Sequence, residues 1–183
     1  MSPRRPSTPS KPRLLRVRRR PGAAPHLGLL SVAGTTLPCA LGRTGTTRFK
    51  REGDGATPIG RFALLFGHHR ADRALPPGGP IRLTPIRPDD GWCDDVADGR
   101  YNRPVRLPFR GSHEEMRRQD HLYDVVIVLD ANVRRRVIGR GSAIFFHLAR
   151  DGFEPTAGCV ALRPEDMRRL LPRLGSHPVM VID

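Results

Sequence analysis

The chain has 183 residues, 38% of them hydrophobic, so it is long enough for one globular domain and too apolar to be disordered throughout. Its formal net charge is +14, from 32 Lys and Arg against 18 Asp and Glu. No apolar stretch reaches transmembrane length, and we expect no signal peptide, because arginines interrupt each apolar run near the N-terminus.

The first 20 residues carry more than half of the excess positive charge. They contain eight basic residues and no acidic one, whereas the rest of the chain has 24 basic against 18 acidic residues. A basic arm can bind nucleic acid or an anionic surface, but no DNA-reading motif and no interleaving of arginine with aromatic residues supports a specific nucleic-acid partner. We therefore expect a solvated arm, whose Pro- and Ser-rich residues 1–12 form a disordered tail.

Residues 13–183 are expected to form one domain made mainly of β-strands. Short apolar segments bounded by turn residues predict strands at 14–19, 26–34, 35–43, 62–69, 123–130, 142–148 and 178–182. Residues 71–115 are rich in Pro, Gly and Asp and have little periodicity. They predict a long, loop-dominated insertion, and long ordered loops are often functional.

One helix is predicted, over residues 163–174. Pro164 suits the first turn of a helix, and acidic residues follow it where the helix dipole favours them. Apolar residues recur at helical spacing, at Met167, Leu170, Leu171 and Leu174. The fold class is therefore mainly β, with one or two short helices.

The cysteines limit the possible metal and disulfide chemistry. The chain has three, Cys39, Cys93 and Cys159, with no CxxC spacing. An odd number excludes a fully paired disulfide set, and a zinc site would need scattered ligands. We expect no metal and no organic cofactor.

The segment from His147 to Cys159, HLARDGFEPTAGC, carries the candidate chemistry. A cysteine and a histidine that meet in the fold suffice for thiolate catalysis, in which the imidazole takes the proton and the sulfur attacks a carbonyl. The alternatives are a buried inert thiol and a core histidine beside Phe145 and Phe146. Gly158 favours the catalytic interpretation, since it permits a tight turn whose amide N–H groups point at a substrate oxygen. Thr156 is a candidate to hydrogen-bond within that turn or to bind substrate.

Two segments together resemble a known family. Thr57–Phe62 reads TPIGRF, and His147 is followed by Thr156–Cys159, TAGC. In this order they resemble the L,D-transpeptidase catalytic domain, the YkuD-like family, over roughly residues 13–183. The resemblance implies a β-sandwich or barrel-like fold, with Cys159 as nucleophile, His147 as general acid and base, and the Gly158 amide in the oxyanion hole.

The chain departs from the family pattern near the cysteine. Many members have an arginine two residues after the cysteine, which is expected to hold a substrate carboxylate, and here that position is Ala161. Arg163, Arg100 and Arg103 are the candidates to replace it. Of these, Arg163 and Arg103 are grouped with Thr156 as the expected substrate-binding residues.

The resemblance implies acyl transfer on peptidoglycan stem peptides through a cysteine thioester. The product would be a 3→3 cross-link between meso-diaminopimelate residues, and with water as acceptor the same site would be a carboxypeptidase. A non-catalytic binding module that depends on the basic arm is a third interpretation. Peptidoglycan cross-linking takes place in the cell envelope, which is the expected location although no signal peptide is visible.

Overall fold

The computed structural model describes residues 14–73 and 76–183, and the predicted tail over residues 1–12 lies outside them. The first strands are β1 (Leu14–Arg19), β2 (Leu27–Val32), β3 (Thr35–Ala40), β4 (Thr46–Thr47), β5 (Thr57–Pro58), β6 (Gly60–His69) and β7 (Leu83–Pro85). The later strands are β8 (Asp90–Cys93), β9 (Arg103–Arg106), β10 (His113–Glu115), β11 (Val125–Leu129), β12 (Phe145–Leu148), β13 (Val160–Leu162) and β14 (Val179–Ile182). The chain is mainly β, as its sequence predicted.

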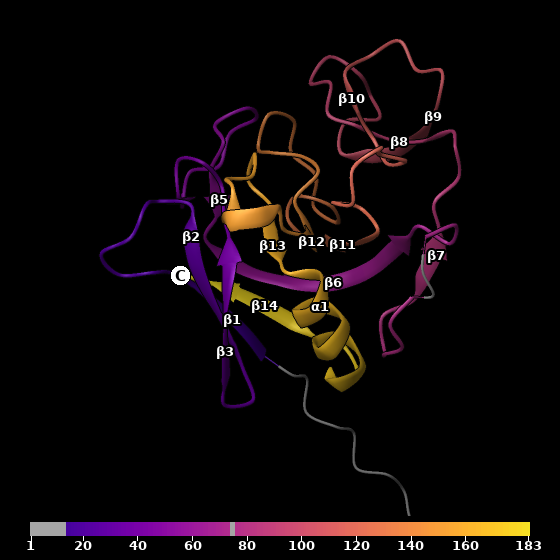
Figure 1. Ribbon diagram of the computed structural model, residues 1–183. Coiled ribbons are helices and arrows are strands. Elements are labelled where there is room, and N and C mark those ends of the chain that lie inside the picture. The colour runs from indigo at the N-terminus through magenta and orange to yellow at the C-terminus, as the bar shows by residue number, and fades with distance from the viewer. Residues whose placement is uncertain (1–13, 74–75) are drawn as a thin grey trace, which may run out of the picture.

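The largest sheet closes on itself. Its strand order is β11-β12-β13-β3-β2-β1-β14-β6-β7, and β11 also pairs with β6. The pairing of β11 with β6 joins the first strand of this order to the last but one. The strands from β11 to β6 therefore form a barrel, and β7 projects from it (Figure 1). Closure leaves few backbone groups unpaired at sheet edges.

Alternating side chains fill the barrel. In β2, every second residue is buried, as expected for a strand with one face toward a core. The interior cluster takes residues from strands far apart in sequence, among them Leu15, Leu30, Phe146 and Val160. The chain thus buries its largest apolar surface inside the barrel, which holds the neighbouring strands in register.

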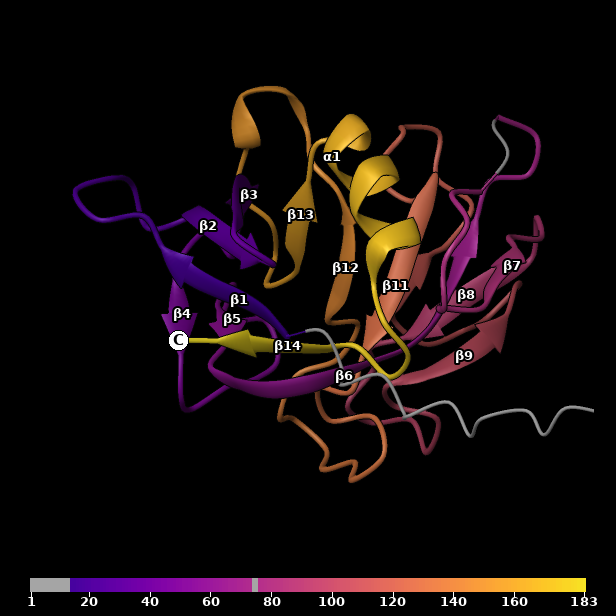
Figure 2. The same cartoon turned by 90° about the horizontal axis from the view of Figure 1, so that it is seen from below.

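The single α-helix of the described residues completes this core. Helix α1 spans Pro164–Leu170 and continues into a 3₁₀ turn at Leu171–Arg173, so the predicted helix is real but its α-helical part ends earlier. Its apolar face, Met167, Leu170, Leu171 and Leu174, is buried in the interior cluster, as predicted. Figure 2 shows α1 beside the strands that carry the later half of the chain. Helix α1 is too short to span a membrane, and no other helix of the described residues is long and apolar enough.

The insertion contains more regular structure than its sequence suggested. Residues 71–115 include β7 and a separate three-stranded sheet of order β10-β8-β9, none of which the sequence predicted. These strands are short, three or four residues each, which hides their periodicity among Pro and Gly. The small sheet lies beside β11 and shares a second apolar cluster with the outer face of the barrel (Figure 1). It forms a wall over that face.

Candidate active site

Two neighbouring parallel strands bring the thiol of Cys159 and the imidazole of His147 into one cavity. His147 lies in β12 and pairs with Ala161 of β13, and Cys159 comes immediately before β13. Both side chains line one cavity of about 360 Å³ on the outer face of the barrel. The parallel pairing therefore places a thiol and an imidazole, 12 residues apart in sequence, in the same cavity.

The ring of His147 is held by the backbone. Its Nδ1 lies 2.8 Å from the carbonyl oxygen of Leu148. A carbonyl oxygen only accepts, so Nδ1 carries the proton and Nε2 is the unprotonated nitrogen. The ring also packs edge-to-face on Tyr123, with centroids 5.4 Å apart. Burial lowers the pKa of His147 to about 4, so the imidazole is neutral near pH 7.

Cys159 is 8% exposed and its sulfur has two backbone partners. The Phe145 N–H donates to Sγ at 3.3 Å, and the thiol donates to the Ala143 carbonyl at 3.2 Å. Burial raises the pKa of Cys159 to about 12. The resting pair is therefore a neutral thiol and a neutral imidazole. The hydrogen bonds of the described residues do not join the two side chains directly, and catalytic hydrogen bonds are often longer before substrate binds.

Thr156 organises the turn that presents the cysteine. Its hydroxyl donates to the Cys159 carbonyl at 2.7 Å and accepts the Gly158 N–H at 3.1 Å. Gly158 has φ +139°, and a Cβ at this position would lie 2.8 Å from the carbonyl oxygen of Ala56. Both the backbone conformation and the lack of space require glycine here. The Gly158 amide, expected in the oxyanion hole, is bonded to Thr156 in this structure.

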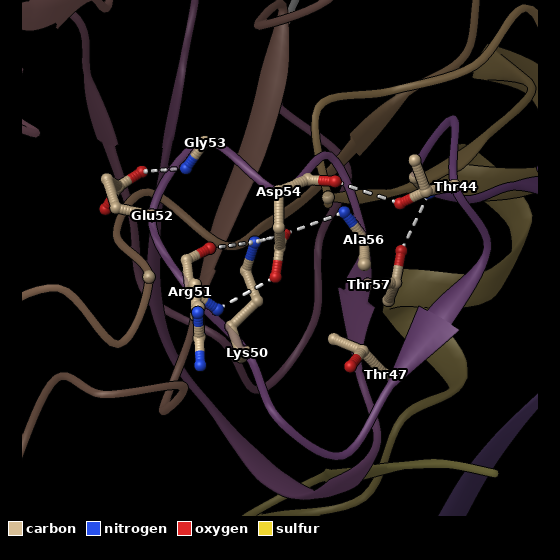
Figure 3. Close-up of polar contacts among 12 residues, drawn as sticks. Thr44, Thr47, Lys50, Arg51, Glu52, Gly53, Asp54, Ala56 and Thr57 are labelled. Atoms are coloured by element: carbon tan, nitrogen blue, oxygen red, sulfur yellow. Dashed lines mark hydrogen bonds and ion pairs between the residues drawn. The ribbon is translucent and has the colours of Figure 1, made fainter.

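The early TPIGRF turn packs under the same cysteine. Thr57 is fully buried, accepts the Gly42 N–H at 2.8 Å and donates to the Cys159 carbonyl at 3.5 Å. Strand β5, Thr57–Pro58, pairs with β4 beside the loop drawn in Figure 3. The two motifs that carry the family resemblance are therefore in direct contact, although 102 residues separate Thr57 from Cys159.

The two arginines expected to bind substrate lie elsewhere. Arg163 is exposed before α1 and stacks over Phe153 at 4.9 Å, and Arg103 in β9 donates to the Asn102 carbonyl at 2.9 Å. Neither lines the cavity of Cys159. Strand β9 is the edge of the small sheet opposite β10, and β10 carries Glu114, which does line the cavity. Among the described residues, the cations that line the cavity are Arg43, Lys50, Arg118 and Arg150.

Tyr123 and Glu114 line the cavity and were not singled out from the sequence. The Tyr123 hydroxyl donates to Glu114 at 3.3 Å, and the Arg118 guanidinium lies 5.2 Å from the Tyr123 ring centre. Burial raises the pKa of Glu114, and the nearby Arg118 opposes that rise. The only feature of the sequence that could have pointed to either residue is the position of Tyr123 just before an apolar strand.

Within residues 14–73 and 76–183, no group of three or more His, Cys, Asp or Glu side chains is arranged to hold a metal ion. Cys39 and Cys93 are buried, unpaired and outside the cavity.

A family model, the YkuD L,D-transpeptidase catalytic domain, matches residues 31–181. The match covers both motifs and most of the barrel. The chain belongs to the L,D-transpeptidase catalytic domain family. Comparison with curated proteins gives no match.

Two solved L,D-transpeptidases are similar to this family member. One is from Mycobacterium smegmatis, with 12% identity and a TM-score of 0.42, and its match covers 93% of this chain and 58% of that one. The other is L,D-transpeptidase 1 of Mycobacterium tuberculosis, with 13% identity and a TM-score of 0.37, covering 93% of this chain and 62% of that one. This L,D-transpeptidase domain therefore spans about three fifths of the length of those chains.

Proposed function

We propose that this chain transfers an acyl group from a peptidoglycan stem peptide through a thioester on Cys159. The supporting observation is that Cys159 shares a cavity with His147, whose Nε2 is left unprotonated by the bond from Nδ1 to the Leu148 carbonyl. A neutral thiol beside a neutral imidazole is the starting state for proton transfer during attack. Family membership supports peptidoglycan as the substrate. The proposed location of the activity is the cell envelope, which contains peptidoglycan.

The reaction begins when Nε2 of His147 takes the thiol proton and the sulfur attacks the carbonyl at the L-centre of meso-diaminopimelate. The π electrons of the carbonyl move to its oxygen. When they return, the C–N bond breaks, and the leaving D-Ala amine takes the proton from His147. An acceptor amine then attacks the thioester, its proton passes to His147 and on to the sulfur, and the 3→3 cross-link is released.

The turn around Gly158 is the proposed oxyanion hole. The Gly158 N–H donates to Thr156 in the resting site, so it must exchange that partner to reach the oxyanion. The Cys159 N–H precedes strand β13, whose ladder begins at Val160, and we assign it as the second donor. Thr156 acts in this proposal by shaping the turn through its bonds to both residues.

The proposal is tested with a disaccharide-tetrapeptide substrate and mass spectrometry of the products. The wild-type protein is expected to release D-Ala and form cross-linked dimers, whereas Cys159→Ala and His147→Gln form neither at a measurable rate. Cys93→Ala, at a buried thiol outside the cavity, is the matched control and keeps activity. Equal rates for Cys159→Ala and wild type would refute the proposed nucleophile.

The same experiment in ¹⁸O-labelled water identifies the acceptor. Cross-linked dimers without label indicate transfer to an amine, whereas labelled tripeptide indicates a carboxypeptidase. Substrate binding without turnover would favour the non-catalytic module and contradict acyl transfer.

A further inference from the structure

Lys50 places a positive charge next to the nucleophile turn. Its side chain is 10% exposed and lines the same cavity as Cys159. The aliphatic stem packs on Gly141, where a Cβ would meet Lys50 Cγ at 2.8 Å. At the other end, a Cβ on Gly158 would lie 3.5 Å from Lys50 Nζ. The ammonium thus lies beside the open Cα face of Gly158, in the turn that holds the thiol.

The loop that carries Lys50 is held by Asp54. Lys50 forms an ion pair with the Asp54 carboxylate and donates to the Arg51 carbonyl at 3.2 Å. The carboxylate also accepts the Arg51 N–H at 2.8 Å and the Ala56 N–H at 2.9 Å (Figure 3). These bonds fix the backbone of the loop and the direction of Lys50. An ammonium has three N–H donors, so the two acceptors here leave one for a ligand.

The other cations of the cavity are engaged differently. Arg118 pairs with Asp120 at 2.8 Å, and Arg150 lies 3.6 Å from the same carboxylate. Arg43 is exposed and reaches the Gly53 carbonyl at 3.4 Å. Burial raises the pKa of Cys159. Of the four cations that line the cavity, Lys50 is the one whose charge lowers this pKa.

We propose that Lys50 is a catalytic residue whose ammonium binds the carbonyl oxygen as it becomes negatively charged during attack by Cys159. This inference rests on the proposed acyl transfer. Lys50 stays protonated throughout: the carbonyl electrons move to oxygen and return when the C–N bond breaks, and Lys50 gives up no proton. A charge held in advance in a buried site is worth more than in water, since little reorganisation is needed at the moment of reaction.

The competing explanation is that Lys50 only pins its loop through Asp54. The two explanations predict different effects of Lys50→Met and Asp54→Asn on the ionisation of the Cys159 thiol. If Lys50 only holds its loop, both substitutions change the thiol in the same direction; if its charge acts on the thiol, they do not. Lys50→Met removes a positive charge near the thiol, whereas Asp54→Asn breaks the same ion pair but leaves the ammonium uncompensated. Lys50→Arg keeps the charge and serves as the conservative variant.

The first experiment measures the rate of alkylation of Cys159 by iodoacetamide at about pH 8, where a lysine ammonium is charged; it is read by mass spectrometry of the Cys159 peptide and needs no substrate. None of the other titratable or charged side chains that line the cavity of Cys159 is changed in these variants: His147, Tyr123, Glu114, Glu52, Asp94, Glu154, Arg43, Arg118 and Arg150. Lys50→Met is expected to lower this rate by about tenfold or more, because less of the thiol is ionised without the nearby charge, and Asp54→Asn to raise it or leave it unchanged. A change in the same direction for both variants would overturn the proposal.

The second experiment measures turnover of the disaccharide-tetrapeptide, with thermal unfolding as a check on folding. Lys50→Met is expected to lower kcat by about 100- to 1,000-fold, as for loss of one oxyanion donor, with little change in KM. Lys50→Arg keeps the charge and is expected to recover most of this loss. A kcat for Lys50→Met within threefold of wild type refutes the role. If the wild type makes no product, the proposed function fails, while the alkylation result still reports on Lys50.

Discussion

The Nδ1 atom of His147 lies 2.8 Å from the carbonyl oxygen of Leu148, its own neighbour in the chain. The imidazole of His147, the proposed base, is therefore oriented by the backbone of its strand and needs no acidic third residue to select its tautomer. Both partners of this hydrogen bond lie in β12, so the folded strand alone fixes the direction of the ring. Tyr123 then packs on the ring from the segment before β11.

Burial of His147 predicts a specific loss of stability in acid. Its pKa is about 4 in the folded protein and near 6.5 when unfolded, so the unfolded chain binds the extra proton first, and stability falls as pH drops from 6.5 toward 4. The difference corresponds to about 3 kcal/mol. Urea unfolding at pH 7 and pH 4.5 should show a smaller loss for His147→Gln than for wild type. Equal losses for the two proteins would contradict a buried neutral imidazole.

Thr156→Val should damage the nucleophile turn. The substitution keeps the shape but leaves the Gly158 N–H without its acceptor and the Cys159 carbonyl without its shortest donor. We expect a loss of about 1–3 kcal/mol in the free energy of unfolding and a lower rate of D-Ala release. Thr156→Ser retains the hydroxyl and should stay close to wild type in both measurements. If valine and serine behave alike, the hydroxyl does not organise the turn.

Gly158→Ala should be more harmful than alanine at a comparable glycine. The new Cβ would lie 2.8 Å from the Ala56 carbonyl oxygen, in a backbone conformation with φ +139°, so the turn must move. Gly99→Ala is the control, because no atom lies within 4 Å of its Cβ position. Thermal unfolding and alkylation of Cys159 should both change for Gly158→Ala alone. Unchanged alkylation of this variant would show that the turn tolerates the side chain.

Phe146 tests the barrel core apart from the active site. It is fully buried in the interior cluster, whereas its neighbours Phe145 and His147 face the cavity side. Phe146→Ala should lower the free energy of unfolding by about 3–5 kcal/mol. Val96→Ala, at a residue that is 46% exposed, should change it by less than about 0.5 kcal/mol. Chemical denaturation of both variants measures the difference.

Local patterns predicted the strands that build the barrel. Burial alternates along β2, which has one face toward the core, and the apolar run of β11 reflects a strand buried on both faces. Both patterns can be recognised in a short stretch of sequence. The small sheet of β8, β9 and β10 was missed, because strands of three or four residues are too short for a period to show. Pairing with a partner strand, which is not local, decides their structure.

The site was predicted in part. His147 and Cys159 were found from residue type and spacing, and the parallel pairing of β12 with β13 places them in one cavity. The substrate-binding arginines were chosen by closeness in sequence to Ala161 or by their place in the insertion, and neither Arg163 nor Arg103 reaches the cavity. Lys50 does reach it, from a loop more than 100 residues earlier in the chain.

By itself, the sequence determined the chemistry available to this protein: a thiol, an imidazole, a glycine turn and a mainly β domain of one family. Only the tertiary structure decided which charges surround the thiol and that the pair rests in its neutral form. The physical reason is that pKa values and electrostatic stabilisation depend on burial and on distances through space. Those distances are set by barrel closure and by the packing of the Lys50 loop against Gly158, which no local pattern encodes.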